Sequence, residues 1–241
     1  MPRKNARALV VGLGGLGCPA AIALARAGVG HVALLDDDEV DPSNLHRQIL
    51  YREGDVGAPK VLAAARALEA FGGSSRFEPI RARLLPETAL ELVRRFDVVI
   101  EGADNFPTKF LAADACGLAG VPVVHGAAVR WYGTALAAGP SGPCYRCLFE
   151  DIPEDEAPNC DEAGVMGPVV GVVGALQASL ALGVLDGKAP FGRLFTFDGK
   201  ADTLRALAVP KRPGCALCAG PRPRALARED YLKGAACRAP S

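Results

Sequence analysis

The feature that most constrains the fold of this 241-residue chain is an apolar segment that leads into three spaced glycines. Ala8–Val11 has the composition of a buried strand, and Gly12, Gly14 and Gly17 follow it with the spacing GxGxxG. Glycines at this spacing allow a tight turn, a close approach of backbone to phosphate, and close packing of the next helix. Because a helix N-terminus carries unpaired N–H groups and a positive dipole, we expect a nucleotide phosphate at this turn.

A second apolar segment, His31–Leu35, ends in Asp36, which lies 19 residues beyond Gly17. A carboxylate at this distance commonly holds a ribose hydroxyl in nucleotide-binding folds. Strand, glycine turn, helix, strand and acid therefore follow one another in the order that a nucleotide site requires. A tight turn that binds nothing is the alternative, and the glycines alone do not distinguish a nicotinamide dinucleotide from ATP.

Predicted helices and strands alternate through the first half of the chain. The helices cover 60–71, 87–95 and 108–118, and the strands cover 77–84, 97–100 and 121–124. This alternation predicts an α/β fold with a Rossmann-like, doubly wound, mainly parallel sheet that is covered on both faces. Ser43 or Asn44 is expected to cap a short helix after the second strand.

The pattern changes after Trp131 to short strands, including 194–197 and 203–207, which predict a C-terminal antiparallel extension of the sheet. We expect residues 1–219 to form one domain, because a chain of this length can bury one large core. Residues 220–241 are rich in Pro and Arg and are expected to form a flexible tail.

The uncharged segment Val165–Leu185 is about long enough to span a bilayer. Pro168, Gln177 and Ser179 interrupt it, and no aromatic or basic residues anchor its ends. A buried core helix is therefore favoured over a transmembrane helix.

The charge balance and the first residues bear on location and partners. Lys plus Arg and Asp plus Glu each number 27, so the chain offers no basic field for nucleic acid or for an anionic membrane. Met1–Arg7 lead directly into the first strand and leave no room for a secretory signal. We expect a cytoplasmic protein that binds neither nucleic acid nor membrane.

Four cysteines form two CxxC pairs, Cys144 with Cys147 and Cys215 with Cys218. Each spacing lets two thiolates bind one ion, and two pairs complete a tetrahedral zinc knuckle. Such a zinc would be structural, because sulfur fills all four positions. The alternative is a redox disulfide, which a cytoplasmic location disfavours.

Cys160 differs from the paired cysteines. It lies between an acidic segment and the glycine-rich start of the apolar helix, where a helix N-terminus would lower the pKa of a thiol. A nucleophile and an ordinary loop cysteine fit this position equally well. Cys18 and Cys116 lie in apolar settings and are expected in the core.

Taken together, the ordered motifs resemble those of the MoeB/ThiF/HesA family of adenylyltransferases, relatives of ubiquitin-activating enzymes. The resemblance runs from about Arg7 to Cys218 and rests on Gly12–Cys18, Asp36–Asp38, Ser43–Gln48, Gly57–Lys60, Asp104 with Asn105, Gly126–Ala128, Pro143–Cys147, Cys160–Gly167 and Pro213–Cys218.

This resemblance implies an ATP-dependent adenylyltransferase that acts on a ubiquitin-like sulfur-carrier protein of the MoaD or ThiS kind. The C-terminal glycine carboxylate of the carrier, which ends in Gly-Gly, would attack the α-phosphate of ATP and release pyrophosphate, for molybdopterin, thiamine or tRNA thiolation. The resemblance also implies a homodimer and an external sulfur donor. Because both reactants are anions, catalysis would consist mainly of positioning and charge neutralisation.

The same resemblance assigns roles to individual residues. The nucleotide would lie on Gly12, Gly14, Gly15 and Gly17, with ribose on Asp36 and Asp38, the phosphates on Asn44, Arg47 and Lys60, support from Gln48, and Mg²⁺ on Asp104 beside Asn105. Arg47, Lys60 and Asp104 would be catalytic, and Cys160 would carry a link to the carrier. Arginine suits forked phosphate contacts, lysine supplies a point charge, and a carboxylate suits Mg²⁺.

One departure from the family concerns the N-terminus. Family members carry a helix before the first strand, from which an arginine reaches the ATP phosphates of the neighbouring subunit. Here Arg3 and Arg7 are the only candidates for that role, so an altered phosphate site, a reduced activity and a truncated start are three open expectations.

Two further functions remain as alternatives. An NAD-dependent oxidoreductase would use the glycine turn, but it leaves Arg47, Lys60 and the paired cysteines unexplained. A catalytically impaired scaffold that binds a carrier without ATP is the other alternative.

Overall fold

The computed structural model describes residues 2–152, 164–188, 190–219 and 226–232. Within these ranges eight strands form one sheet in the order β3-β2-β1-β4-β5-β6-β7-β8. Five of them are parallel, namely β1 (Arg7–Val11), β2 (His31–Leu35), β3 (Arg76–Ile80), β4 (Val98–Glu101) and β5 (Val123–Val129). The antiparallel part comprises β6 (Tyr132–Ala138), β7 (Arg193–Asp198) and β8 (Thr203–Ala208). The predicted α/β fold, with a mainly parallel sheet and an antiparallel extension, is confirmed.

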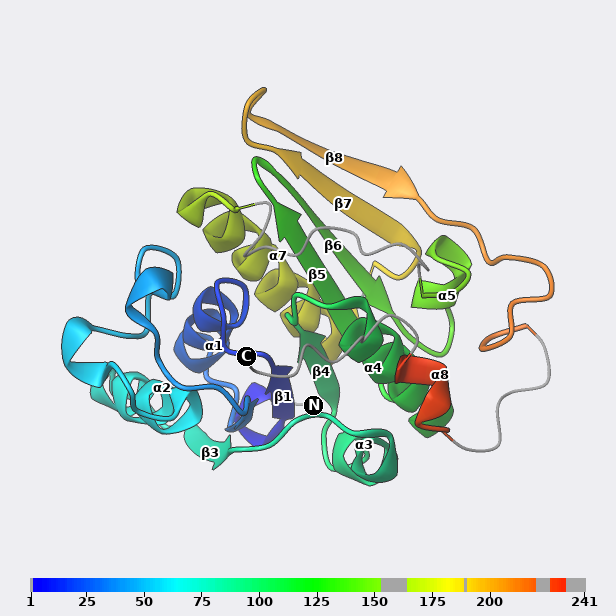
Figure 1. Ribbon diagram of the computed structural model, residues 1–241. Coiled ribbons are helices and arrows are strands. Elements are labelled where there is room, and N and C mark those ends of the chain that lie inside the picture. Colours follow the sequence, from blue (N-terminus) through cyan, green and yellow to red (C-terminus); the bar gives the residue numbers. More distant parts are fainter. Residues whose placement is uncertain (1, 153–163, 189, 220–225, 233–241) are drawn as a thin grey trace.

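Helices cover both faces of the sheet (Figure 1). One face carries α1 (Gly17–Arg26), α2 (Lys60–Ala70) and α7 (Gly167–Leu185). The other face carries α3 (Pro86–Val93), α4 (Phe106–Ala119), α5 (Tyr145–Leu148) and α8 (Glu229–Leu232). The described ranges also contain three short 3-10 helices, η1 (Arg3–Asn5), η2 (Pro42–Asn44) and η3 (Glu53–Asp55).

The parallel strands β1, β2 and β4 are almost entirely buried because a helical layer packs on each face, whereas the edge strand β3 is partly exposed. One apolar cluster joins the sheet to α1, α2 and α7 and includes Val10, Leu24, Leu68 and Leu180. A second cluster joins the sheet to α3 and α4 and includes Leu9, Val93 and Phe110. Because β1 to β5 pair in parallel, their carboxyl ends lie at one edge of the sheet, where ligands bind in folds of this kind.

Two strands differ from the prediction by three residues in length, more than the others do. β3 ends at Ile80 rather than at residue 84, because its partner β2 ends at Leu35 and offers nothing further to pair with. β5 extends to Val129 rather than ending at residue 124, because the antiparallel strand β6 pairs with it up to Tyr132.

The short helix η2 is capped by Asp41, not by Ser43 or Asn44 as predicted. The Asp41 carboxylate accepts a hydrogen bond from the backbone N–H of Ser43 at 2.8 Å and another from the Ser43 hydroxyl. These hydrogen bonds lower the pKa of Asp41. The cap lies earlier than predicted because Pro42, which suits a first helical position, begins the helix.

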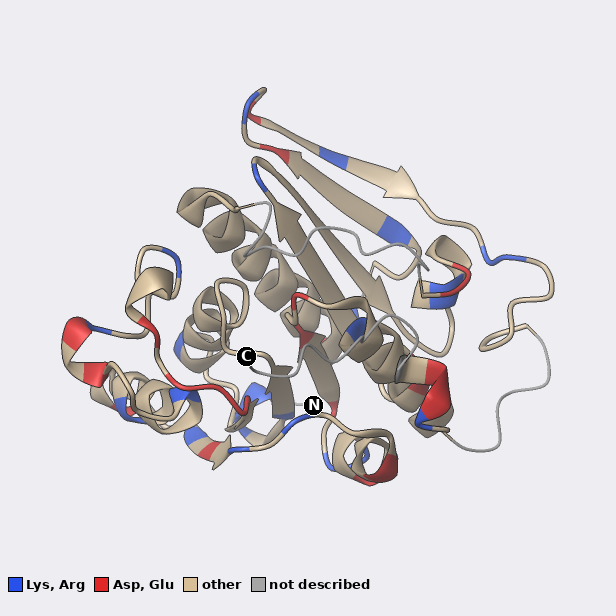
Figure 2. Ribbon diagram, in the orientation of Figure 1, with Lys and Arg blue, Asp and Glu red and all other residues tan. Residues whose placement is uncertain are grey.

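Among the described residues, α7 is the one helix long and apolar enough to cross a membrane by length and composition. It has no charged residue, as Figure 2 shows, and it lies over β4, β5 and β6 against α1. Val173 and Gln177 are fully buried. The Gln177 amide donates to the carbonyl oxygens of Glu101 at 2.7 Å and Val124 at 3.2 Å. The prediction of a core helix agrees with this packing.

Gly126 lies in β5 directly against Gln177, and this contact yields a stability prediction. A Cβ at position 126 would lie 2.3 Å from the side-chain amide carbon of Gln177, so β5 and α7 would have to move apart. We expect Gly126→Ala to lower the free energy of unfolding by about 1–3 kcal/mol, measured by urea denaturation.

Gly171→Ala is the matched control, because Gly171 lies in α7, the helix that contains Gln177. A Cβ there meets nothing within 4 Å. Alanine favours a helix over glycine by up to about 1 kcal/mol, so this variant should be at least as stable as the parent. Equal loss of stability in the two variants would contradict the close contact between Gly126 and Gln177.

Candidate functional site

The glycine turn joins β1 to α1 and is as tight as the sequence predicts. Gly12 has a φ of +84°, a conformation that favours glycine. A Cβ at Gly17 would lie 1.9 Å from the carbonyl oxygen of Gly12, so only glycine fits there without rearrangement. A Cβ at Gly12 would lie 3.2 Å from the backbone of Gly102 and Ala103, which follow β4. The turn therefore packs closely against the loop after β4.

The next two glycines of the turn face other parts of the site. Gly14 lies near the side chain of Gln48, and a Cβ at Gly15 would lie 2.9 Å from Val170 of α7. Gln48 is buried, and within the described part of the chain its Oε1 has no hydrogen-bond partner. A buried acceptor without a partner is uncommon in proteins, so this oxygen is available to a donor at the turn.

Asp36 stands at the carboxyl end of β2 and is fixed by the backbone around it. Its Oδ2 accepts from the N–H of Leu13 at 2.7 Å, and its Oδ1 accepts from the N–H of Asp38 at 2.9 Å. Burial raises the pKa of Asp36 despite these bonds and the nearby ammonium group of Lys60. Each carboxylate oxygen can accept more than one hydrogen bond, so both can still bind a hydroxyl.

Lys60 begins α2 and places its ammonium group between acidic side chains. Its Nζ lies 2.8 Å from Oδ2 of Asp38, and its side chain is only 7% exposed. Burial by itself lowers the pKa of Lys60, but the carboxylates of Asp36 and Asp38 outweigh burial and raise it. Lys60 is therefore a fixed positive charge at the wall of the site.

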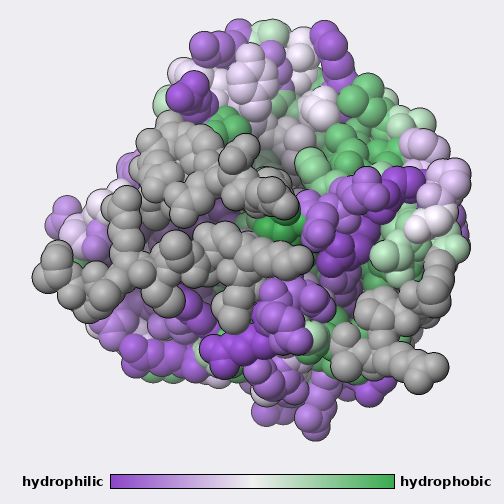
Figure 3. All heavy atoms as spheres, turned by 45° about the vertical axis from the view of Figure 1, so that its right-hand side comes forward, coloured by the Kyte–Doolittle hydropathy of each residue, from purple (hydrophilic) through white to green (hydrophobic). Residues whose placement is uncertain are grey.

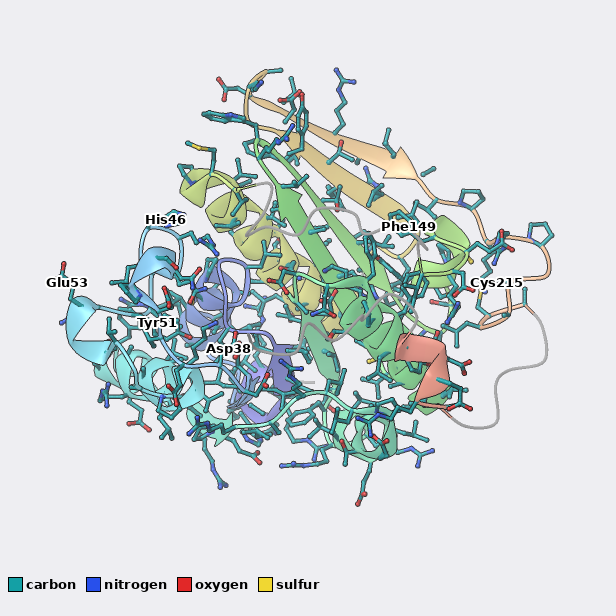
Figure 4. All side chains as sticks on the ribbon, viewed as in Figure 1. Asp38, His46, Tyr51, Glu53, Phe149 and Cys215 are labelled. Atoms are coloured by element: carbon teal, nitrogen blue, oxygen red, sulfur yellow. The ribbon has the colours of Figure 1, made fainter. Side chains whose placement is uncertain are left out.

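The segment after η2 contributes a second cation. Nδ1 of His46 donates to the carbonyl oxygen of Ser43 at 2.8 Å, and its Nε2 lies 3.4 Å from Nη1 of Arg47. Sequence reasoning missed Tyr51, whose hydroxyl donates to the carbonyl oxygen of Leu13 at 2.9 Å. This hydrogen bond joins the segment that follows η2 to the glycine turn. Figure 4 shows His46 and Tyr51 on the same side of the molecule as Asp38.

Several of these side chains line one pocket of about 630 Å³ that opens to solvent, whereas Asp36, Gln48 and Tyr51 are not among its lining residues. The described residues that line it are Asp38, Glu39, Asp41, Ser43, Asn44, His46, Arg47, Lys60, Gly164 and Val165. Four predicted site residues therefore meet in one place, namely Asp38, Asn44, Arg47 and Lys60. The pocket combines the cations Arg47 and Lys60, which suit phosphate binding, with the carboxylates of Asp38, Glu39 and Asp41.

Asp104 and Asn105 do not line this pocket. Both are exposed in the loop between β4 and α4, which packs on the glycine turn through Gly102 and Ala103. Asn105 caps α4, because its side-chain oxygen accepts from the N–H of Thr108 at 2.9 Å. Its Nδ2 lies 3.5 Å from Oδ1 of Asp104.

The four paired cysteines come together, as the zinc interpretation requires. Their sulfur atoms all lie within 4.8 Å of one another. Cys144 Sγ lies 3.8 Å from Cys147 Sγ and 3.4 Å from Cys215 Sγ, and Cys147 Sγ lies 3.3 Å from Cys218 Sγ. Although burial opposes it, hydrogen bonds from the backbone of Cys218 and of Leu217 lower the pKa of Cys215 to about 7. Figure 4 shows Cys215 well apart from Asp38.

Other cysteines have different settings. Cys18 and Cys116 are fully buried, as predicted for core residues, and burial raises the pKa of Cys18 to about 12. Cys160 lies outside the described residues, so its role stays a prediction.

The chain is similar to known proteins over nearly its whole length. A family model described as the ThiF family matches residues 3–217. The chain is 44% identical over 237 residues to "Sulfur carrier protein adenylyltransferase" of Thermus thermophilus, and the alignment covers 95% of this chain and 87% of the relative. It is 39% identical over 235 residues to "SAMP-activating enzyme E1" of Haloferax volcanii, covering 96% of this chain and 87% of the relative.

Two other similarities cover less of the matching protein. "Adenylyltransferase and sulfurtransferase MOCS3" of Anopheles gambiae is 44% identical over 220 residues, which are 89% of this chain but 50% of the relative. The chain thus spans about half the length of that relative. A solved structure, "Crystal structure of E. coli MccB + ATP", matches with a TM-score of 0.79 and 23% identity over 90% of this chain and 68% of that one. At this identity the likeness shows the fold alone.

Proposed function

The chain belongs to the ThiF family, and from this premise we propose that it adenylates the C-terminal glycine carboxylate of a ubiquitin-like sulfur-carrier protein. One observation carries the proposal: a pocket beside the glycine turn gathers Asn44, Arg47 and Lys60 at the carboxyl edge of the sheet. The relative named for sulfur-carrier adenylation, 44% identical over nearly the whole chain, supports this substrate class. An NAD-dependent oxidoreductase is not favoured, because hydride transfer assigns no catalytic role to Arg47 or Lys60.

The reaction joins two anions. A carboxylate oxygen of the carrier attacks the α-phosphorus of ATP, the bond from that phosphorus to the oxygen bridging to the β-phosphorus breaks, and pyrophosphate leaves with its electron pair. No protein nucleophile is needed for this step. Arg47 and Lys60 would neutralise the phosphates and stabilise the charge that develops on the leaving group.

Lys60 would change partners when ATP binds. Its ammonium group contacts Asp38 at 2.8 Å, so a triphosphate would compete with that carboxylate for the same cation. Asp36 is already oriented by the N–H of Leu13 and would accept the ribose hydroxyls. Gln48 would support the phosphate side of the site as a donor through its Nε2, the atom nearest to Gly14.

Mg²⁺ is the metal that this chemistry uses, and the carboxylate of Asp104 is a suitable hard oxygen ligand. Asp104 is exposed in a loop that packs on the glycine turn, so it faces no competing buried partner. When bound, Mg²⁺ would supply further neutralisation of the phosphate charge.

A structural Zn²⁺ fits the four-cysteine group. Zinc–sulfur bonds of about 2.3 Å in a tetrahedron place the sulfur atoms about 3.8 Å apart. The closest Sγ pairs here lie 3.3 to 3.8 Å apart, so small shifts would accommodate the ion. We propose that the ion fastens the segment 215–218 to α5, without a catalytic role.

We also propose that the protein acts in the cytoplasm as a homodimer. Its partners would be a carrier that ends in Gly-Gly and an external sulfur donor. Cys160 is proposed to carry a link to the carrier after adenylation. Large apolar side chains that remain exposed, including Phe149, Leu204 and Leu207, offer surface for a protein partner, and apolar surface is visible on the face drawn in Figure 3.

The direct test is to incubate the protein with Mg²⁺, ATP and a Gly-Gly-ended carrier and to measure the intact mass of the carrier. We expect the carrier to gain one AMP, and a carrier without its last glycine to gain none. Binding of NAD in preference to ATP, with no AMP on any carrier, would contradict the proposal. Carrier binding that is indifferent to Mg²⁺ and ATP would instead favour the scaffold alternative.

A further inference from the structure

Three ionisable side chains form a buried network where β4, β5 and α4 meet. Nζ of Lys109 lies 3.1 Å from both carboxylate oxygens of Glu101, and it donates to the carbonyl oxygen of Gly126 at 2.5 Å. Nδ1 of His125 donates to Oε2 of Glu101 at 3.1 Å. The Glu101 side chain is fully buried, the Lys109 side chain is 7% exposed and that of His125 is 3% exposed.

The charge states of the network follow from its environment. Burial by itself raises the pKa of Glu101, but Lys109 and His125 outweigh it, so the overall shift is downward. Burial lowers the pKa of His125 despite the adjacent carboxylate, which leaves a neutral ring. The network is therefore a buried ion pair with a neutral hydrogen-bond donor.

Such a network is not explained by stability alone. Taking two charges out of water is costly, and apolar residues of similar volume often replace a buried ion pair with no loss of stability. What an ion pair adds is direction, because each donor and acceptor must meet its partner at a fixed place. The question is which part of the molecule the network fixes.

The network holds the backbone of the loop that carries Asp104. Oε1 of Glu101 accepts from the backbone N–H of Ala103 at 2.7 Å, immediately before Asp104. Lys109 is the fourth residue of α4, the helix that follows the loop, and its Nζ donates to the same carboxylate. The backbone of Gly102 and Ala103 in turn packs on the glycine turn.

Asp104 itself makes little contact that would orient it. Within the described part of the chain, its one hydrogen bond is the 3.5 Å contact from Asn105. Asn105 caps α4 and fixes where the helix begins, but it holds the backbone after Asp104 rather than before it. The backbone on the other side is held by Glu101.

We propose that Glu101, Lys109 and His125 are positioning residues that hold the loop 102–105 so that Asp104 faces the phosphates of the nucleotide. This inference rests on the proposed function, since it assigns Asp104 to the nucleotide and its metal. The carboxylate of Glu101 acts on Asp104 through the N–H of Ala103, and Lys109 with His125 keeps that carboxylate charged and oriented.

The test measures binding rather than turnover. Mn²⁺, which replaces Mg²⁺ and is detected by electron paramagnetic resonance, is titrated into the protein with ATP present. Glu101→Gln keeps the shape of the side chain but removes its charge, and we expect about tenfold weaker Mn²⁺ binding with ATP, as for other residues that orient a metal ligand. Hydrogen exchange of the peptide that spans 102–108 should become faster. Asp104→Asn should weaken Mn²⁺ binding at least as much.

Two further variants separate positioning from general destabilisation. Glu101→Gln with Lys109→Met removes both charges, so no lone buried charge remains, and it should weaken Mn²⁺ binding as the single variant does. Asp114→Asn is the control, because it breaks another largely buried ion pair on α4, with Arg146, and does not touch the loop. It should leave Mn²⁺ binding with ATP unchanged.

The outcomes distinguish this inference from the proposed function. Parent-like Mn²⁺ binding and unchanged hydrogen exchange in the double variant would overturn the positioning role while leaving adenylation intact. Equal weakening by Asp114→Asn would also overturn it, because the effect would then reflect stability. Failure of the parent protein to bind ATP with Mn²⁺ would overturn both.

Discussion

Replacing Lys60 by alanine is expected to slow carrier-dependent exchange of pyrophosphate into ATP by about 10²- to 10³-fold, the usual effect of removing a preorganised group that stabilises transition-state charge. The ammonium group is almost completely buried and lies beside Asp36 and Asp38. Without it, a triphosphate in the pocket would face these two carboxylates with less compensating charge. The rate is measured with labelled pyrophosphate at several ATP concentrations.

Arg66→Ala is the matched control for this prediction. Arg66 lies on the same helix, α2, but its side chain is 65% exposed and its ion pair with Asp55 lies away from the pocket. Exposed ion pairs contribute little to stability, so this variant should exchange at close to the parent rate. If Lys60→Ala retained more than a tenth of the parent rate, the phosphate role of Lys60 would be wrong.

Replacing Cys215 by serine is expected to lower the melting temperature by roughly 8–16 °C and to abolish stoichiometric zinc binding. An ion held by both CxxC pairs closes a loop of roughly 70 residues, which by chain entropy stabilises the fold by about 4 kcal/mol. For a domain of this size, each kcal/mol corresponds to roughly 2–4 °C. Calorimetry and metal analysis of the purified protein measure the two effects.

Chelation provides the control for the cysteine prediction. Removing the metal from the parent protein should lower its melting temperature to that of Cys215→Ser, and the same treatment should leave the variant unchanged. Because Cys215 lies well apart from Asp38, ATP binding should persist in the variant at temperatures where it is folded (Figure 4). A parent protein that holds no metal, or that chelation does not destabilise, would contradict the zinc proposal.

The α/β fold with a mainly parallel sheet could be predicted because local signals mark its strands and its first turn. Buried parallel strands are continuous apolar runs, and Gly12 and Gly17 mark the first turn by the absence of side chains. Strand ends could not be predicted, since they depend on the neighbouring strand: β3 stops after Ile80 because β2 stops at Leu35, and β5 continues to Val129 because β6 returns beside it.

Part of the candidate site could be predicted because its residues stand in ordered motifs. Asn44, Arg47 and Lys60 were assigned to the phosphates by the resemblance of these motifs to the ThiF family, and the structure gathers the three residues in one pocket. Glu101 and Lys109 were missed, because an acid at a strand end and a lysine in a helix are ordinary surface residues by periodicity. Their burial arises only when three elements from distant parts of the chain meet.

The contact of α8 with α4 could not be predicted for a similar reason. Tyr231 lies in a polar segment with no apolar periodicity, yet it is buried, and its hydroxyl donates to Oδ2 of Asp114 at 2.8 Å. A sequence pattern describes one segment at a time, whereas this contact joins residues 117 positions apart. The buried carboxylate of Asp114 in an apolar helix was the available signal, since a buried charge requires partners.

The measurement that tests the central claim most directly is ATP–pyrophosphate exchange by the purified protein with Mg²⁺, against a panel of ubiquitin-like carriers that end in Gly-Gly. We expect exchange with one of these carriers, and none when the terminal glycine of that carrier is deleted. Exchange would establish the adenylation step and identify the carrier together. Folded, metal-loaded protein that exchanges with no carrier in the panel would contradict adenylation of a sulfur carrier by this protein.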